Sequence, residues 1–362
     1  MHPDKANSPR QSSLISTVNQ RMEPHEDKKL GLALVGLGHY ATECIAVGLQ
    51  NSAYWQLNAI ATGSAAKIPA WQKQWNIKED RIFNYQNFDQ IGNCNDVDAV
   101  YICLPNSLHA EFTIRAAEAG KHVIVEKPMA TTIEDAQRMI AACQSAGVEL
   151  AVGYRLRFNR LHQKIAEWGS QKSKGKVQLI NAIFSIDVGE PDQWRLQKSL
   201  AGGGALIDVG IYCVQAARYT TGAEPISVTA QFGPVTNANK FCEVEEQISW
   251  QMRFPGEIYM TGYAGYNQYI DELCISTSTD FYKLEPAFAY GPLHGVQRAE
   301  VKSELETIPH EHHQWKQMEE LGRLFLSSEP LPAWISGEEG LRDLKILKAI
   351  YQAANSGKEV FL

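Results

Sequence analysis

Apolar and polar residues alternate in two different ways along this chain. Up to residue 152, short apolar runs typical of buried strands cover residues 30–35, 57–61, 99–103, 122–125 and 150–152. Between them, apolar residues recur with the period of a helix at residues 40–49, 65–75, 108–119 and 133–146. Strands that alternate with helices of this length predict an α/β fold with a doubly wound parallel sheet.

The pattern changes after Gly153. Longer strand-like runs cover residues 177–188, 226–232, 243–254, 258–263 and 272–276, and helix-like stretches cover 161–168, 205–220, 313–325 and 338–354. Long strands joined by short turns such as Pro255-Gly256 predict an α+β domain with a large, mostly antiparallel sheet. We therefore expect a flexible N-terminal arm over residues 1–29, the α/β domain over 30–150 and the α+β domain over 151–362.

Length and composition favour a soluble enzyme of two domains. The 362 residues exceed what one core usually supports, at roughly 150 residues per domain, so a cleft between two domains is expected. Hydrophobic residues make up 44% and charged residues 21% of the chain, which is ordinary for a soluble enzyme. The net charge of -7 argues against a nucleic-acid partner. The apolar runs stop far short of the ~18 residues that a membrane span requires, so no membrane partner is expected.

The cysteines and the N-terminus favour a cytoplasmic location. The seven cysteines are odd in number and scattered, without a C-x-x-C pair, so they predict neither a disulfide framework nor a zinc site. Residues 1–29 are polar and lack the apolar segment of a secretory signal. His310, His312 and His313 lie close together but lack the H-E-x-x-H spacing, so no metal is expected.

The first strand runs into a glycine turn with the sequence G-L-G-H-Y-A. Glycines placed where a strand turns into a helix let main-chain N–H groups approach a pyrophosphate at the helix N-terminus. The motif alone also fits an ordinary tight turn, but its place after the first strand of an α/β alternation favours a Rossmann dinucleotide site. The residues expected to contact the cofactor here are Gly36, Gly38, His39, Tyr40 and Ala41.

The end of the second strand favours NADP over NAD. An acid about 20 residues beyond the glycine turn would bind the ribose 2'-hydroxyl of NAD, yet residues 51–77 contain no Asp or Glu. The segment instead offers the hydroxyl of Ser64 and the ammonium of Lys67, which suit a 2'-phosphate. The alternative is that Lys67 only faces solvent on a helix.

A third turn, Leu104-Pro105-Asn106-Ser107-Leu108-His109, follows the strand at 99–103 and opens a helix. The carboxyl ends of parallel strands form the ligand side of such a sheet. We therefore expect Leu104, Asn106 and His109 to lie beside the nicotinamide. Asn106 is equally well placed to cap the helix.

The segment Glu126-Lys127-Pro128 places a charge at the carboxyl end of a buried strand. Hydride transfer from an alcohol requires a base for the hydroxyl proton and donors that hold the oxygen near the nicotinamide. Lys127 is a suitable donor, and Glu126 and Lys127 are expected to line the cofactor site. The alternative for Lys127 is a surface lysine paired with a carboxylate.

Asp208 and Tyr212 are four residues apart in the helix-like stretch after Gly202-Gly203-Gly204, so both project from one face. A free phenol has a pKa of about 10. It is therefore almost fully protonated at neutral pH, and little phenolate is present to act as a base. A neighbouring ammonium favours the phenolate, and Lys127 is a candidate for that ammonium. We predict that Tyr212 is the general acid/base and Asp208 an orienting or substrate-binding carboxylate. The alternative is a capping aspartate and an interface tyrosine.

Several motifs occur together in order and resemble one family. They are G-L-G-H-Y-A at 36–41, P-N-S-L-H at 105–109, A-G-K-H-V-I-V-E-K-P at 119–128, G-Y-R-x-x-F at 153–158, W-R-L-x-x-x-L-A-G-G-G-A-L-I-D-V-G-I-Y at 194–212, E-P-A-F-A-Y at 285–290 and S-G-E-E-G-L-R-D at 336–343. From about Leu30 to its end, the chain resembles the Gfo/Idh/MocA oxidoreductases, and within them the glucose-fructose oxidoreductase branch. The resemblance implies a Rossmann domain, a C-terminal domain with a large antiparallel sheet, and a homodimer or homotetramer assembled through that sheet.

The resemblance also implies roles for single residues. Lys127 matches the catalytic lysine, Asp208 the substrate-site aspartate and Tyr212 the proton-transfer residue of the family. Arg155, Trp194 and Arg195 match cofactor-contacting positions of the branch, and the Lys127-Pro128 peptide is expected to be cis. Residues 1–29 have no clear counterpart there, so neither export nor permanent retention of the cofactor is carried over.

The expected activity is NADP-dependent hydride transfer to or from a sugar or cyclic polyol. Two alternatives remain on the same scaffold. One is a different substrate, a trans-dihydrodiol or 1,5-anhydrofructose, and the other is a non-catalytic nucleotide-binding regulator.

Overall fold

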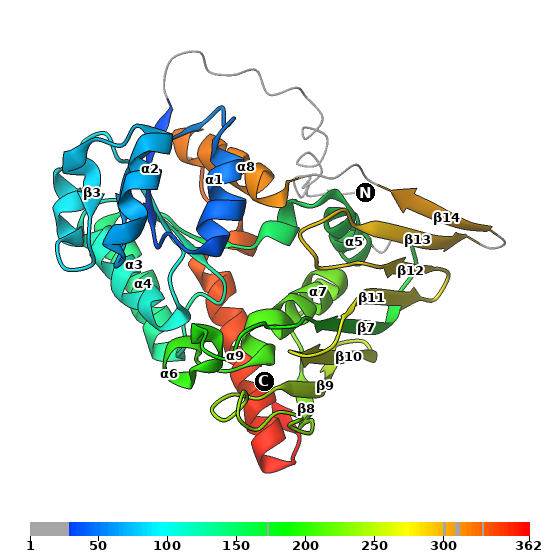
Figure 1. The fold of residues 1–362 in the computed structure, drawn as a ribbon. Coiled ribbons are helices and arrows are strands. Elements are labelled where there is room, and N and C mark those ends of the chain that lie inside the picture. The colour runs from blue at the N-terminus through cyan, green and yellow to red at the C-terminus, as the bar shows by residue number, and fades with distance from the viewer. Residues whose placement is uncertain (1–28, 172–173, 300–301, 308–311, 328) are drawn as a thin grey trace, which may run out of the picture.

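The computed structural model describes residues 29–362 except 172–173, 300–301, 308–311 and 328 (Figure 1). The predicted arm, apart from residue 29, and His310 lie outside the described residues. Among the described residues, strands gather into one sheet of six and one sheet of nine.

The first sheet is parallel, with the strand order β3-β2-β1-β4-β5-β6. Its strands are β1 (Leu30–Val35), β2 (Trp55–Ala61), β3 (Ile82–Phe83), β4 (Ala99–Ile102), β5 (His122–Glu126) and β6 (Leu150–Gly153). The connecting helices are α1 (Ala46–Leu49), α2 (Ile68–Trp75), α3 (His109–Glu118) and α4 (Ile133–Ala146). The predicted doubly wound sheet is confirmed. The order reverses between β1 and β4, and sheets of this kind bind ligands at such a switch point.

Local sequence explains these elements. Every residue of β1 is buried, as expected for a strand covered on both faces. The helix α4 begins where the Thr132 side chain accepts a hydrogen bond from the Asp135 N–H, and it ends at Gly147, whose φ of 66° is left-handed.

The second sheet is mostly antiparallel, in the order β14-β13-β12-β11-β7-β10-β9-β8-β15, with β7 and β10 parallel to each other. Its strands are β7 (Val177–Ser185), β8 (Ser227–Phe232), β9 (Gln247–Phe254), β10 (Ile258–Gly265), β11 (Ile270–Thr277), β12 (Phe281–Leu284), β13 (His294–Ala299), β14 (Lys302–Thr307) and β15 (Val360–Phe361). Buried and exposed residues alternate along β9, as the pattern predicted for a sheet with one solvated face.

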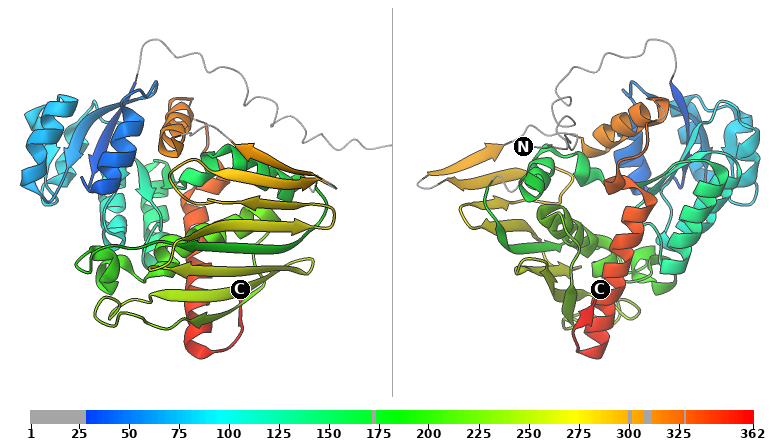
Figure 2. Two further views of the ribbon diagram at one scale, coloured as in Figure 1. Left: turned by 45° about the vertical axis from the view of Figure 1, so that its right-hand side comes forward. Right: turned by 180° about the vertical axis from the view of Figure 1, so that it is seen from behind.

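Helices pack on one face of this sheet and leave the other open among the described residues (Figure 2). They include α5 (Arg160–Gln171), α7 (Ile211–Thr221) and α9 (Gly337–Ser356); the short α6 (Lys198–Ala201) precedes α7. The described stretch Lys198–Thr221 is long and apolar enough to span a membrane, but 83% of its apolar window is buried inside the structure. That burial is usual for a core helix.

The helix α8 (His313–Ser327) comes late in the chain but packs against the first sheet, beside α1 (Figure 1). Trp55 Nε1 donates to the carbonyl oxygen of Met318 at 2.6 Å, and the N–H of Ala53 donates to Glu319 Oε2 at 3.0 Å. A helix from late in the chain thus packs against the first sheet, and the division at residue 150 stays a prediction.

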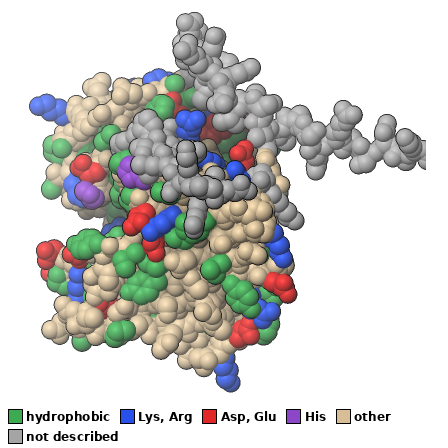
Figure 3. Space-filling model, turned by 90° about the vertical axis from the view of Figure 1, so that its right-hand side faces the viewer, with side chains coloured by type: hydrophobic (Ala, Val, Ile, Leu, Met, Phe, Trp, Pro, Cys, Tyr) green, Lys and Arg blue, Asp and Glu red, His purple; other side chains and the backbone are tan. Residues whose placement is uncertain are grey.

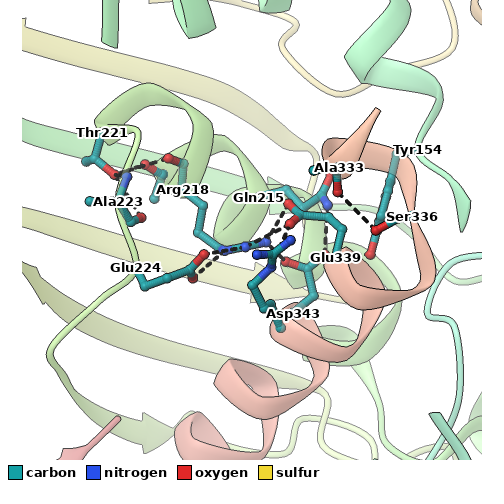
Figure 4. Close-up of polar contacts among 12 residues, drawn as sticks. Tyr154, Gln215, Arg218, Thr221, Ala223, Glu224, Ala333, Ser336, Glu339 and Asp343 are labelled. Atoms are coloured by element: carbon teal, nitrogen blue, oxygen red, sulfur yellow. Dashed lines mark hydrogen bonds and ion pairs between the residues drawn. The ribbon is translucent and has the colours of Figure 1, made fainter. Parts of the chain in front are cut away.

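A buried charge cluster joins α7 to α9 (Figure 4). The Arg218 guanidinium pairs with Glu224 at 2.6 Å, Glu339 at 2.8 Å and Asp343 at 2.5 Å. Tyr154, just after β6, donates its hydroxyl to Asp343 Oδ2 at 2.7 Å. The cluster thus connects the C-terminal helix to the end of the first sheet.

Candidate active site

Lys127 and Asp208 meet at the carboxyl end of β5. Lys127 directly follows β5, and Asp208 lies in a π-helical turn (Leu206–Gly210) that leads into α7. Lys127 Nζ donates to the carbonyl oxygen of Asp208 at 2.7 Å and lies 3.2 Å from its carboxylate Oδ1. An ammonium has three N–H donors, so these contacts leave one donor for a further acceptor.

Burial and neighbouring charged or polar groups determine the charge state of this pair. Asp208 Oδ2 accepts from Arg195 Nε at 3.1 Å and from the Tyr266 hydroxyl at 3.2 Å. Burial alone would raise the pKa of Asp208, but Lys127 and Arg195 lower it to about 2. Burial alone would likewise lower the pKa of Lys127. Its electrostatic interactions with Tyr212 and Asp208 exceed this effect, so the pKa of Lys127 lies above its usual value. Both residues are therefore charged at neutral pH.

Tyr212 lies between two cations. Lys127 Nζ is 4.8 Å and Arg155 Cζ is 4.9 Å from the centre of its ring. Tyr212 is in the first turn of α7, one turn after Asp208, so one helix start places both side chains beside Lys127. The structure thus brings the three predicted reacting residues together.

Glu245 holds the start of that helix in place. Its carboxylate accepts from the N–H groups of Gly204 at 2.9 Å and Leu206 at 3.0 Å, and from the Tyr351 hydroxyl at 2.7 Å. A Cβ atom at position 204 would collide with the main-chain oxygen of Glu245, so this close approach requires a glycine. The signal available in the sequence was the run of three glycines, but it did not identify the carboxylate.

The glycine turn has the geometry that a dinucleotide requires. Gly36 has a φ of 88°, and a Cβ there would collide with the carbonyl oxygen of Cys103, which directly follows β4. Beside Gly38, no heavy atom of the described residues lies within 4 Å of the Cβ position, so a ligand has room to approach the main chain there. His39 is exposed, Tyr40 is half-buried and Ala41 is buried.

Ser64 and Lys67 follow β2 beside this turn. Lys67 Nζ donates to the carbonyl oxygen of Leu37 at 2.7 Å, which keeps the ammonium next to the glycine turn. The N–H of Ser64 bonds to Thr62 Oγ1 at 3.1 Å. The residues predicted to hold a 2'-phosphate thus lie at the end of β2. Lys67 is exposed, and its contact with a phosphate stays a prediction.

The turn after β4 is held to other parts of the site. Asn106 is buried and donates to the carbonyl oxygen of Ala201 at 2.8 Å; it does not cap a helix, because Pro105 and Leu108 occupy the N-cap positions. His109 is fully buried, with one ring nitrogen 2.9 Å from the carbonyl oxygen of Leu104 and the other 2.9 Å from that of Pro128. His109 therefore fixes this turn against the residue that follows Lys127.

The Lys127-Pro128 peptide is cis, as the resemblance implied. Beside it, Glu126 accepts from the Tyr101 hydroxyl at 2.7 Å, and Gln317 of α8 donates to that hydroxyl at 2.9 Å. Burial raises the pKa of Glu126, although the hydrogen bond from Tyr101 and the charge of Lys127 oppose the increase. Glu126 is thus connected to α8 through the Tyr101 hydroxyl.

The three residues matched to cofactor contacts lie near the reacting groups. Arg155 is buried between the rings of Tyr212 and Tyr290, and Arg195 pairs with Asp208. Trp194 is half-buried, with Arg195 Cζ 4.6 Å from the centre of its ring. Their predicted contact with the cofactor stays a prediction.

Within the described residues, no group of three or more His, Cys, Asp or Glu side chains is arranged to hold a metal ion.

Comparison with known proteins shows the family. A family model described as the oxidoreductase family with an NAD-binding Rossmann fold matches residues 30–154, and one for the GFO/IDH/MocA C-terminal domain matches residues 162–279. The crystal structure of aldose-aldose oxidoreductase from Caulobacter crescentus, complexed with glycerol, is similar with a TM-score of 0.88 and 36% identity, covering 92% of this chain and 100% of that one.

Two curated relatives differ in how much they share. D-xylose 1-dehydrogenase (NADP(+)) of Haloarcula marismortui is 28% identical over 345 residues, which cover 93% of this chain and 94% of that protein. The 1,5-anhydro-D-fructose reductase of Ensifer adhaerens is 35% identical over 136 residues, covering 37% of this chain and 41% of that protein.

The fold and these matches define an oxidoreductase with a Rossmann domain for a nicotinamide dinucleotide. The chain belongs to the Gfo/Idh/MocA family, as the sequence motifs indicated.

Proposed function

We propose that this protein transfers a hydride between NADP and a sugar or cyclic polyol, interconverting a hydroxyl group with a carbonyl group. The observation that supports this most is the ammonium of Lys127, held by Asp208 against the ring of Tyr212 at the carboxyl end of β5. This is the ligand side of a doubly wound sheet.

Each residue has a distinct task in this proposal. The nicotinamide, when bound, accepts or returns the hydride. Lys127 uses its remaining N–H to hold the substrate oxygen, while Asp208 keeps the ammonium in place. Tyr212 takes the hydroxyl proton in the oxidative direction and returns it in the reductive direction. The cations Lys127 and Arg155 both lie within 5 Å of the centre of the Tyr212 ring, at 4.8 Å and 4.9 Å.

NADP is the proposed cofactor because of the charge at the end of β2. Lys67 is held at the glycine turn, and residues 51–77 contain no acid that would repel a phosphate. The xylose dehydrogenase relative carries NADP in its name, which agrees with this assignment.

A polyhydroxylated substrate is favoured over an apolar diol. Asp208, Arg195 and Tyr266 form a connected polar cluster next to Lys127, and such groups bind hydroxyls. The aldose-aldose oxidoreductase and xylose dehydrogenase relatives support a sugar. The 1,5-anhydrofructose alternative shares the same cluster, whereas a regulator would not require the Lys127–Asp208 pair.

The open face of the second sheet is the proposed surface for self-association. It carries exposed apolar side chains on neighbouring strands, and the corresponding side of the molecule mixes hydrophobic with charged groups (Figure 3). The exposed residues on these strands are Leu179, Tyr259, Ile270 and Phe281. We place the resulting homodimer or homotetramer in the cytoplasm, in keeping with the free cysteines.

Nucleotide titration tests the proposal. Protein stripped of nucleotide is titrated with NADPH and with NADH while tryptophan fluorescence is followed. Selective binding of NADPH is expected, followed by turnover in a screen of sugars and polyols. Failure to bind either nucleotide would contradict the proposed function.

A further inference from the structure

Tyr290 is an exposed aromatic residue next to the reacting groups. Its side chain is 53% exposed, whereas Phe288, two residues earlier, is fully buried. Arg155 Cζ lies 4.4 Å from the centre of the Tyr290 ring and 4.9 Å from that of Tyr212. One guanidinium thus connects the exposed ring to the proposed proton-transfer residue.

The loop that carries Tyr290 is held through both its main-chain N–H groups and its main-chain carbonyl oxygens. The Asp271 carboxylate accepts from the N–H groups of Ala287 at 2.9 Å and Phe288 at 2.7 Å. Arg155 donates to the carbonyl oxygens of Phe288 and Ala289. The main chain directly before Tyr290 is therefore anchored at residues 287–289, which limits how far its exposed side chain can move before a ligand binds.

The ring also faces the first domain. Its centre lies 6.0 Å from that of Tyr40, which belongs to the glycine turn. Tyr290 therefore lies between the cofactor turn and the proton-transfer residue, where a substrate has to pass or bind. Arg155 covers one side of the ring, and the exposed part is free for another contact.

We propose that the ring of a cyclic sugar or polyol packs on the side chain of Tyr290, and that this contact selects cyclic over open-chain substrates. This inference rests on the proposed function. The C–H face of such a ring is apolar and flat, and an aromatic side chain offers a matching surface. An open-chain polyol of the same composition presents no such face, while its hydroxyls still reach Lys127 and Asp208.

The test compares Tyr290→Leu and Tyr290→Phe in the full chain with NADP. The substrates are a pyranose or cyclic polyol that the wild type oxidises, and an open-chain polyol of equal carbon number. For Tyr290→Leu we expect the KM of the cyclic substrate to rise about tenfold or more, with kcat changed by less than about threefold. The KM of the open-chain polyol and the affinity for NADPH should stay within about twofold.

Tyr290→Phe is the matched control, because it keeps the ring and removes only the hydroxyl. Its KM for the cyclic substrate should stay within about threefold of the wild type. If Tyr290→Leu leaves the KM for the cyclic substrate unchanged, or raises the KM for both substrates equally, the inference is overturned. Turnover by the wild type in the same assays would still support the proposed function. A wild type that turns over neither substrate class would overturn the proposed function, and the inference with it.

Discussion

Lys127 donates to two oxygen atoms of one residue, the main-chain carbonyl oxygen of Asp208 at 2.7 Å and its carboxylate Oδ1 at 3.2 Å. The two residues are 81 positions apart in the sequence. Lys127 directly follows β5, and Asp208 lies in the turn before α7. A carbonyl and a carboxylate together fix the direction of an ammonium better than a single ion pair. These two contacts also fix the direction of the remaining N–H of Lys127. A fixed donor direction is what holding a substrate oxygen requires.

Tyr212→Phe should slow the chemical step itself. The substitution removes the hydroxyl that exchanges the proton but keeps the ring that packs against Lys127 and Arg155. We expect hydride transfer to slow by roughly 10²- to 10⁴-fold. Stopped-flow measurement of nicotinamide absorbance in a single turnover checks this, and a normal transient rate would remove Tyr212 from the mechanism.

Asp208→Asn should destabilise the protein by roughly 2 kcal/mol at neutral pH. Because the pKa of Asp208 is lowered to about 2 in the folded protein, its contribution is present above the unfolded pKa of about 4. The contribution is lost as the pH falls through about 2. Urea denaturation of both proteins should give a constant difference between about pH 5 and pH 9 and a smaller one below about pH 4. A difference that changes near neutrality would contradict this assignment.

Lys67→Ala should weaken NADPH binding by about tenfold and leave NADH binding within about twofold. Its ammonium lies at the glycine turn, where the 2'-phosphate is expected, and NADH has no such phosphate. Lys73→Ala is the matched control, since Lys73 is exposed in the last turn of α2. Equal losses for both nucleotides in Lys67→Ala, measured by fluorescence titration, would contradict the proposed phosphate site.

Arg218→Met should lower the free energy of unfolding by roughly 3–5 kcal/mol. The substitution leaves the buried Asp343 and Glu339 without their cation, as the contacts in Figure 4 indicate. Arg253→Met is the control, because Arg253 is half-exposed and pairs with Glu359 at 3.4 Å, a contact worth less than about 1 kcal/mol. Similar unfolding free energies for the two variants in urea would show that the cluster contributes little.

Local sequence was sufficient for much of the site. The glycine turn, Lys127 at a strand end, and the pair Asp208 and Tyr212 on one helix face all depend on short-range periodicity and turn chemistry. These features place the reacting groups because a doubly wound sheet brings its strand ends together.

The long-range partners were beyond such patterns. Tyr266 bonds to Asp208 across 58 positions, and Glu245 supports the same helix start from another loop. Arg155 was matched to the cofactor, yet its guanidinium contacts Tyr212 and Tyr290. These pairings depend on how distant segments pack, which spacing along the chain does not encode.

The sequence pattern missed both edge strands of the second sheet, β14 and β15, as well as β12 and β13 next to β14 and the edge strand β3 of the first sheet. The strand β14 has the sequence Lys-Ser-Glu-Leu-Glu-Thr, in which a single apolar residue gives no alternation to detect. Edge strands are often short or charged, which prevents pairing with other chains. The polar character that hides such a strand in the sequence is therefore suited to its place in the sheet.

The role of Lys127 is tested by comparing wild type with Lys127→Ala in NADP reduction by a panel of sugars and cyclic polyols. We expect turnover by the wild type and a loss of roughly 10²-fold or more in kcat for the variant, with NADPH affinity and folding retained. Unchanged turnover in Lys127→Ala would contradict the role of the ammonium that Asp208 holds.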